Sequence, residues 1–257
     1  MQKILLFRAL PLFVFLNFFP FAFSQKTDSI KVAGRFGGAV TFTTKGISTI
    51  PNLTLGKPAV IFDMTVGRRL SFEPQFRFAL EGKPWSFLFW WRYELLNTDK
   101  FQFKIGAHPA FSFKTLIDTM YGASEESIVT TQYLAGELAS SFLITKGIGI
   151  GMYYLYSRGI EKDITQHTNY LALRFIFSNI KLSDQFFIRL NPQVYYLKMD
   201  KNDGFYFNGT LTLAKRNFPL SISSLINKTI QTEIPVGDDL LWNVSLIYTF
   251  NKRYVEL

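Results

Sequence analysis

The segment Trp85-Ser86-Phe87-Leu88-Phe89-Trp90-Trp91-Arg92-Tyr93-Glu94-Leu95 decides the fold, because its odd positions all carry large apolar side chains. Its even positions include Ser86, Arg92 and Glu94, although two apolar residues interrupt that polar set. A period of two places the two sets on opposite faces of a β-strand. The segment therefore predicts a strand with one aromatic face and one polar face.

The next segment, Phe101-Gln102-Phe103-Lys104-Ile105-Gly106-Ala107-His108, repeats this alternation and keeps every polar side chain at one parity. Two environments fit such strands. In a soluble sandwich the aromatic face packs against a second sheet, whereas in a membrane barrel it meets lipid. The composition favours lipid: 48% of the residues are apolar and 17% aromatic, including 28 Phe, yet the mean hydropathy is only +0.12. Apolar and polar residues are therefore interleaved along the chain.

The first 24 residues differ from the rest and predict a secretory signal peptide. Lys3 precedes an apolar run from Ile4 to Phe23, and the small residues Ala22 and Ser24 stand before Gln25, as at a cleavage site. An uncleaved membrane anchor is the alternative, and Arg8 inside the run argues against it. We expect residues 1–24 to be the signal peptide and residues 25–257 to form one outer-membrane barrel domain. After residue 24 no run of about eighteen apolar residues predicts a transmembrane helix.

Charge and residue usage limit the partners of the exported chain. Its formal charge falls from +9 to +7, because Lys3 and Arg8 leave with the signal peptide. Without a concentrated Lys/Arg run this surplus does not indicate nucleic-acid binding, and anionic lipid headgroups or small anionic solutes are the expected partners. The chain has no Cys and only two His. We therefore expect no disulfide, no transition-metal site and no cofactor.

The alternation predicts about twelve antiparallel strands in an up-and-down transmembrane β-barrel, an all-β fold of the bacterial outer membrane. The connections between them alternate, incompletely, between short turns and longer loops, as expected for a periplasmic and an outer side. Aromatic residues near strand ends, namely Trp85, Tyr93, Tyr156, Trp242 and Tyr248, are expected at the membrane interfaces. The predicted strands span residues 30–43, 57–67, 69–80, 84–96, 100–113, 126–141, 146–158, 166–178, 184–198, 203–215, 218–231 and 239–250.

Three of these strands share a polar-Pro-x-apolar-x-aromatic pattern, at Glu73-Pro74, His108-Pro109 and Asn191-Pro192. Proline has no backbone N–H and is unfavourable inside a sheet. We expect either a bulge or strained segment at each proline, or a strand that begins there.

The signal end followed by Gln25, the aromatic hairpins, the proline pattern and the closing Trp242-Asn243-Val244-Ser245-Leu246-Ile247-Tyr248-Thr249-Phe250 resemble small outer-membrane β-barrel proteins of the Bacteroidota. The resemblance covers the mature chain and concerns architecture rather than activity. It implies that the last strand ends on an aromatic residue, Phe250, that the barrel-assembly machinery recognises. Residues 251–257 continue beyond this position, which departs from the pattern.

The polar parity predicts a set of side chains that line the lumen. A cationic side chain facing lipid at mid-membrane costs about 2–4 kcal/mol, so charges within the strands should face inward. These residues either pair and fill the interior or leave a cationic, water-filled path that favours anions. The lumen-lining candidates are Arg35, Asp63, Arg69, Glu73, Arg77, Arg92, Glu94, Lys104, His108, Glu137, Arg174 and Arg189.

Three functions are compatible with the sequence: a narrow passive pore with a cationic lumen, a non-conducting structural or accessory barrel of an envelope complex, and a lipid-modifying enzyme. The sequence argues against the enzyme, because neither His108-Pro109-Ala110 nor His167-Thr168-Asn169 supplies the nucleophile at the spacing of known outer-membrane lipid hydrolases. We expect His108 to form hydrogen bonds in the lumen instead.

Overall fold

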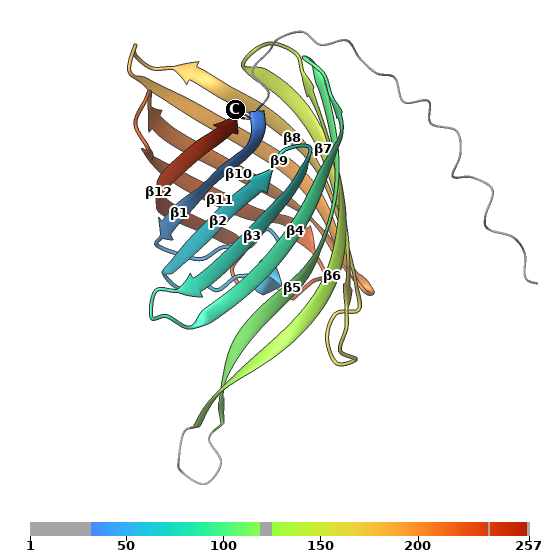
Figure 1. Ribbon diagram of the computed structural model, residues 1–257. Coiled ribbons are helices and arrows are strands. Elements are labelled where there is room, and N and C mark those ends of the chain that lie inside the picture. The colour runs from blue at the N-terminus through green and yellow to red at the C-terminus, as the bar shows by residue number, and fades with distance from the viewer. Residues whose placement is uncertain (1–31, 119–124, 236, 256–257) are drawn as a thin grey trace, which may run out of the picture. The chain divides into compact units, whose positions relative to one another are not determined.

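The computed structural model describes residues 32–118, 125–235 and 237–255. Twelve antiparallel strands form a closed barrel in chain order, and β1 pairs with β12 to complete it (Figure 1). The predicted all-β, twelve-stranded barrel is thereby confirmed. The strands are β1 (Val32–Thr43), β2 (Ala59–Gly67), β3 (Leu70–Ala79), β4 (Pro84–Asn97), β5 (Phe101–Asp118), β6 (Glu125–Leu143), β7 (Ile148–Gly159), β8 (His167–Lys181), β9 (Phe186–Met199), β10 (Asn202–Lys215), β11 (Leu220–Thr232) and β12 (Leu240–Val255).

The predicted signal peptide, residues 1–24, lies outside the described residues and stays a prediction. Within the described ranges the only helical segment is a 3₁₀ turn, η1 (Pro51–Leu53), which follows β1. No helix in this part of the chain has the length and apolar character needed to span a membrane.

Closure of the barrel depends on the seam between β1 and β12. The two strands pair from Val32 opposite Val255 to Thr43 opposite Ser245, while β1 also pairs with β2 on its other side. On the β2 side, a Cβ atom at Gly38 would collide with the Asp63 carbonyl oxygen, so the close approach of β1 to β2 requires glycine at this position. The seam leaves the sheet without an open edge, which hydrocarbon surroundings demand.

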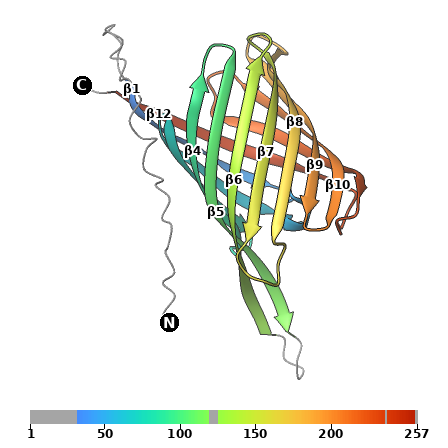
Figure 2. The same cartoon turned by 90° about the vertical axis from the view of Figure 1, so that its right-hand side faces the viewer.

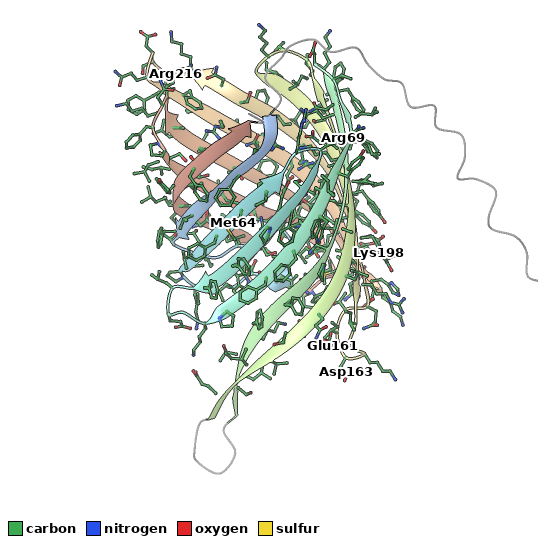
Figure 3. The ribbon with its side chains drawn as sticks, viewed as in Figure 1. Met64, Arg69, Glu161, Asp163, Lys198 and Arg216 are labelled. Atoms are coloured by element: carbon green, nitrogen blue, oxygen red, sulfur yellow. The ribbon has the colours of Figure 1, made fainter. Side chains whose placement is uncertain are left out.

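The two ends of the barrel differ in their connections. One end, here called the turn end, carries both ends of the barrel chain and the short turns 68–69, 98–100, 144–147, 182–185 and 216–219. The opposite end, the loop end, carries the described segments 44–58, 80–83, 160–166, 200–201, 233–235 and 237–239. Figure 3 shows Arg69 and Arg216 at the turn end and Glu161 and Asp163 at the loop end. The expected alternation of short and longer connections is present, with two short connections at the loop end.

Strands β5 and β6 extend further than predicted and form a two-stranded arm at the loop end (Figure 2). β5 pairs with β4 only as far as Ser112, and β6 pairs with β7 only from Tyr133. Beyond these positions the two strands pair with each other alone, out to Asp118 opposite Glu125. The hairpin therefore projects past its neighbours.

Strand β12 does not end at Phe250, so that prediction is wrong. It continues to Val255 because β1 begins at Val32 and offers pairing partners for the added residues. The aromatic residue implied by the resemblance thus lies inside the strand and not at its end.

The three prolines lie inside β3, β5 and β9, and each strand begins between four and eight residues before its proline. At Pro74, Pro109 and Pro192, two residues are unpaired on the side of the preceding strand: the proline itself and the residue before it. The register is the same on both sides of each gap, and the ladder toward the following strand is continuous. The expected bulges and strand starts are therefore wrong at these sites: the missing N–H interrupts one ladder without displacing the strand.

Side chains alternate between a buried inner face and an exposed apolar outer face. On β9, Tyr195 is 2% exposed whereas Val194 is 44% exposed, and the same contrast separates Trp90 from Trp91 on β4. Exposed apolar side chains occur on every strand from β1 to β12 and form an apolar belt around the barrel. Such a belt is unstable in water and is what a lipid-facing barrel surface requires.

Trp85 departs from the predicted parity and from the predicted interfacial position. The pairing of β3 with β4 shifts by one residue between Arg77 and Phe78, which turns Trp85 inward. Its ring is buried, and its Nε1–H donates a 2.9 Å hydrogen bond to the Leu53 carbonyl oxygen. Tyr156, Trp242 and Tyr248 are exposed, and their place at the membrane interfaces stays a prediction.

A charge on the outer face should be costly, whereas a charge on the inner face should be tolerated. We predict that Val194→Arg lowers the free energy of unfolding in lipid by about 2–4 kcal/mol. Asn191→Arg, on the inner face of the same strand, is the control and should change it by less than half as much. Urea titration of the protein in bilayers measures both values, and equal losses would contradict the assignment of faces.

Candidate functional site

A layer of charged side chains crosses the middle of the barrel interior and centres on Arg92. Its guanidinium group donates hydrogen bonds to Glu73 from Nη1 at 2.5 Å and to Glu137 from Nε at 2.5 Å. The Tyr153 hydroxyl donates a further hydrogen bond of 2.6 Å to Glu137. We call Glu73, Arg92, Glu137 and Tyr153 the polar layer. One cation thus holds two carboxylates that come from strands on either side of it.

The register of β4, β5 and β6 makes this layer possible. Gly106 on β5 stands between Arg92 on β4 and Glu137 on β6, opposite both of them. A Cβ atom at Gly106 would lie 2.9 Å from Glu137 Oε1 and 3.1 Å from Arg92 Cγ. The absence of a side chain on β5 therefore lets two residues that are 45 positions apart meet across an intervening strand.

Trp90 supports the layer from the loop side. The Arg92 guanidinium carbon lies 4.2 Å from the Trp90 ring centroid. The ring centroid of His108, on β5, lies 3.8 Å from that of Trp90. His108 is buried, and its Nδ1 lies 3.2 Å from the Pro109 carbonyl oxygen. This stacking fixes the direction of the Arg92 side chain.

The remaining predicted lumen residues divide between the two ends. Toward the turn end, Lys104 pairs with Glu94 at 3.0 Å, and both line a cavity of about 450 Å³ together with Arg35. Toward the loop end, Arg77 donates a 2.8 Å hydrogen bond to Gln75, and its guanidinium lies 5.2 Å from the Trp85 ring centroid. Gln75 is also the register partner of Asp63 on β2.

Arg174 and Arg189 lie on the inner face without a carboxylate partner at ion-pair distance among the described residues. The Arg174 guanidinium lies 4.7 Å from the ring centroid of Tyr153, so it adjoins the polar layer. Arg189 pairs in register with the buried Thr212 and lies 5.3 Å from the Phe187 ring centroid.

Arg69 does not belong with the others. It lies in the turn before β3, exposed at the rim of the turn end (Figure 3). Its guanidinium donates hydrogen bonds to the backbone carbonyl oxygens of Glu94 and Leu95 and lies over the Tyr93 ring. β3 begins one residue later than predicted. Arg69 therefore binds the backbone of β4 at the rim and does not line the interior.

A row of tyrosines on the inner face of β7 to β10 was not predicted from the sequence. Tyr170 lies 5.8 Å from Tyr153 and 4.8 Å from Tyr195, and Tyr195 stacks on Tyr206 at 4.9 Å between ring centroids. The Tyr195 hydroxyl donates to Asn227 Oδ1 at 3.0 Å. Parity alone places these rings on the inner face. The predicted lumen residues are mostly charged, however, and uncharged tyrosines are not in that set.

The segment between β1 and β2, residues 44–58, folds into the loop-end mouth, and we call it the mouth segment. Ile50 packs against the buried cluster that contains Tyr170, Leu197 and Met199. Leu53 accepts the Trp85 hydrogen bond described above, and a Cβ atom at Gly46 would lie 3.1 Å from the Trp85 ring. The mouth segment therefore narrows the barrel from the loop end.

Two cavities lie inside the barrel on either side of the polar layer. The loop-end chamber, about 380 Å³, lies beneath the mouth segment and includes Ile50, Arg77 and His108 in its wall. The turn-end chamber, about 440 Å³, includes Lys104 and Asn191. Arg92, Tyr153, Arg174 and Gln193 line both chambers. The polar layer, together with Arg174 and Gln193, therefore lies between the two chambers.

The described residues offer little chemistry beyond charge and hydrogen bonding. They contain no group of three or more His, Asp or Glu side chains that could hold a metal ion. The two histidines face different environments: His108 is buried inside, whereas the exposed His167 contacts the Tyr156 hydroxyl through Nδ1 at 2.8 Å. In this part of the chain neither histidine has a serine or threonine hydroxyl as a hydrogen-bond partner.

Known structures with a similar fold are outer-membrane barrels. An outer-membrane channel from Pseudomonas putida F1 aligns over 88% of this chain and 100% of its own, with 10% sequence identity and a TM-score of 0.50. The NanC porin aligns over 86% of this chain and 100% of its own, with 12% identity and a TM-score of 0.47. LpxR from Salmonella typhimurium aligns over 83% and 100%, with 12% identity and a TM-score of 0.45. No protein-family model and no curated protein matches the sequence.

At these identities the likeness concerns the fold alone. Together with the closed sheet and the apolar belt, it defines the class of protein: the chain is a bacterial outer-membrane β-barrel whose interior is polar and divided into two chambers.

Removal of the central cation should leave one buried and one partly buried carboxylate that repel each other. We predict that Arg92→Leu lowers the free energy of unfolding by about 3–5 kcal/mol. The triple variant Glu73→Gln, Arg92→Leu, Glu137→Gln removes all three charges and should recover most of that loss. Urea unfolding followed by tryptophan fluorescence measures both variants. An equal loss in the single and triple variants would show that the ion pairs do not govern stability.

Proposed function

We propose that the protein is a narrow passive pore for small solutes in the outer membrane, with its loop end outside and its turn end in the periplasm. One observation carries this proposal: two cavities of about 380 and 440 Å³ lie inside the barrel and share the lining residues Arg92, Tyr153, Arg174 and Gln193. In the proposed pore a solute passes the mouth segment and the polar layer, and both must give way to it.

The interior charge supports a preference for anions. Of the predicted lumen residues that lie within the barrel, Arg35, Arg77, Arg92, Lys104, Arg174 and Arg189 are cations, and Asp63, Glu73, Glu94 and Glu137 are carboxylates. Six positive charges against four negative ones leave a surplus of two. A lumen with a surplus of cations attracts anions and repels cations.

A non-conducting accessory barrel, as part of an envelope complex, is the second candidate. The closed ion pairs of Arg92 and the inserted mouth segment favour it, because both fill the space that a pore needs. An enzyme is not proposed, since a hydrolytic histidine needs a nucleophile within hydrogen-bond reach. In either role the barrel contacts outer-membrane lipid and depends on the barrel-assembly machinery, and the proposed signal peptide directs its export.

Tyr153 provides the most direct test of conduction, because its ring lines both chambers. We predict small single-channel steps for the wild-type protein in a planar bilayer and steps several times larger for Tyr153→Ala. Tyr154→Ala, the adjacent residue on the outer face, is the matched control and should leave the steps unchanged. A salt gradient should give a reversal potential of the sign that indicates anion preference. Complete silence of the wild-type protein and of Tyr153→Ala would reject the pore in favour of the accessory barrel.

A further inference from the structure

The loop-end chamber differs from the rest of the interior in its charge. Its wall contains three arginines, Arg77, Arg92 and Arg174, and no Asp or Glu is among the described residues that line it. The turn-end chamber, in contrast, contains both Glu73 and Glu137. Arg92 is neutralised by these two carboxylates, which leaves Arg77 and Arg174 as the cationic groups that determine the potential of the loop-end chamber.

Unsatisfied polar atoms mark one side of this chamber. Arg77 Nε and Ser86 Oγ are buried and have no hydrogen-bond partner within the described part of the chain. The two residues are register partners on β3 and β4, and both line the chamber. Buried donors of this kind are uncommon in native proteins, because each costs the free energy of its lost hydration. Both atoms have almost no accessible surface, so a ligand oxygen reaches them only after the side chains of Arg77 and Ser86 turn toward the chamber.

Asp63 is the nearest carboxylate to be considered as an internal partner of Arg77. It lies on β2, opposite Gln75 and diagonal to Arg77, and does not line the chamber. The two groups form no ion pair at 4 Å or less, and Asp63 Oδ1 itself has no hydrogen-bond partner among the described residues. Arg77 is therefore available to an additional anion, and Asp63 competes with that anion electrostatically.

Apolar side chains also line the loop-end chamber, some of them next to Arg77 and Ser86. Leu88, Ala110 and Leu155 contribute from the strands, and Ile50 and Leu53 contribute from the mouth segment. An inorganic ion would leave this surface in contact with water, whereas an apolar group would cover it. The volume of about 380 Å³ suits a small organic molecule and lies within the usual range for ligand sites.

We propose that the loop-end chamber is a saturable binding site for a small organic anion with an apolar body, such as an aromatic or short aliphatic carboxylate. Arg77 and Ser86 bind the anionic group, Arg174 contributes long-range attraction, and the mouth segment covers the apolar body. The inference deepens the proposed pore function and rests on it for the physiological role of the site as a solute stop on the path. Binding itself requires only access from solution.

The test is a titration of the refolded mature protein in detergent micelles, followed by calorimetry and tryptophan fluorescence. The probes are benzoate, benzamide as its uncharged analogue, and acetate as a charge without the apolar body. Saturable benzoate binding is expected, with benzamide and acetate at least about tenfold weaker, since each lacks one of the two interactions. Equal affinity for benzoate and benzamide, or no saturable benzoate binding, overturns the proposal.

Variants locate the site. Arg77→Gln and Ser86→Ala should weaken benzoate binding, by about tenfold for the arginine. Asp63→Asn should strengthen binding, because it removes the competing carboxylate. Arg189→Gln, an inner-face arginine outside the chamber, is the matched control and should leave affinity unchanged. Heat-modifiable gel mobility verifies the fold of each variant. Unchanged affinity in folded Arg77→Gln and Ser86→Ala overturns the assignment.

The two proposals fail separately. Benzoate binding by a protein that never conducts in bilayers supports the site and rejects the pore. Conduction without benzoate binding supports the pore and rejects the site.

Discussion

The pairing of every backbone polar group in a closed sheet is the constraint on which the rest of this structure depends. In hydrocarbon an unpaired N–H or C=O costs several kcal/mol, so the first and last strands must meet. Glycines on β1 permit close approach on both sides: a Cβ atom at Gly38 would collide with the backbone of β2, and one at Gly37 would lie 3.1 Å from the Phe250 carbonyl oxygen of β12. Once the sheet is closed, a period of two assigns each side chain either to lipid or to an enclosed interior. Charged side chains within the strands must then face the interior.

That enclosure explains why the interior is organised around Arg92. In the middle of the barrel, where Arg92 and Glu137 are largely removed from solvent, each charge needs partners. Glu73 and Glu137 approach Arg92 from strands on opposite sides, and Gly106 leaves the intervening position open. The same layer separates the two chambers, so in the proposed pore the residues that stabilise the interior are also those that a solute must pass. That proposal couples stability and permeability through a few side chains.

Alternation and turn spacing were enough to predict the barrel and its twelve strands, because both follow from backbone geometry. The prolines were misleading: a missing N–H implies a broken ladder, but Pro74 interrupts only one of its two ladders and keeps the register. Charged inner residues such as Arg92 followed from parity, whereas their pairing did not, since it depends on Gly106 across 45 positions. The inward position of Trp85 depends on a local register shift, which alternation does not reveal. The tyrosine row consists of neutral side chains, so a search for charged inner residues misses it.

The central claim is that successive side chains alternate between lipid and an enclosed interior. The chain has no native cysteine, so single cysteines at residues 193 to 196 of β9 can each carry a fluorophore in bilayers that contain brominated lipid. The account predicts strong quenching at positions 194 and 196 and weak quenching at 193 and 195. Uniform quenching along the four positions, or none at any of them, would contradict it.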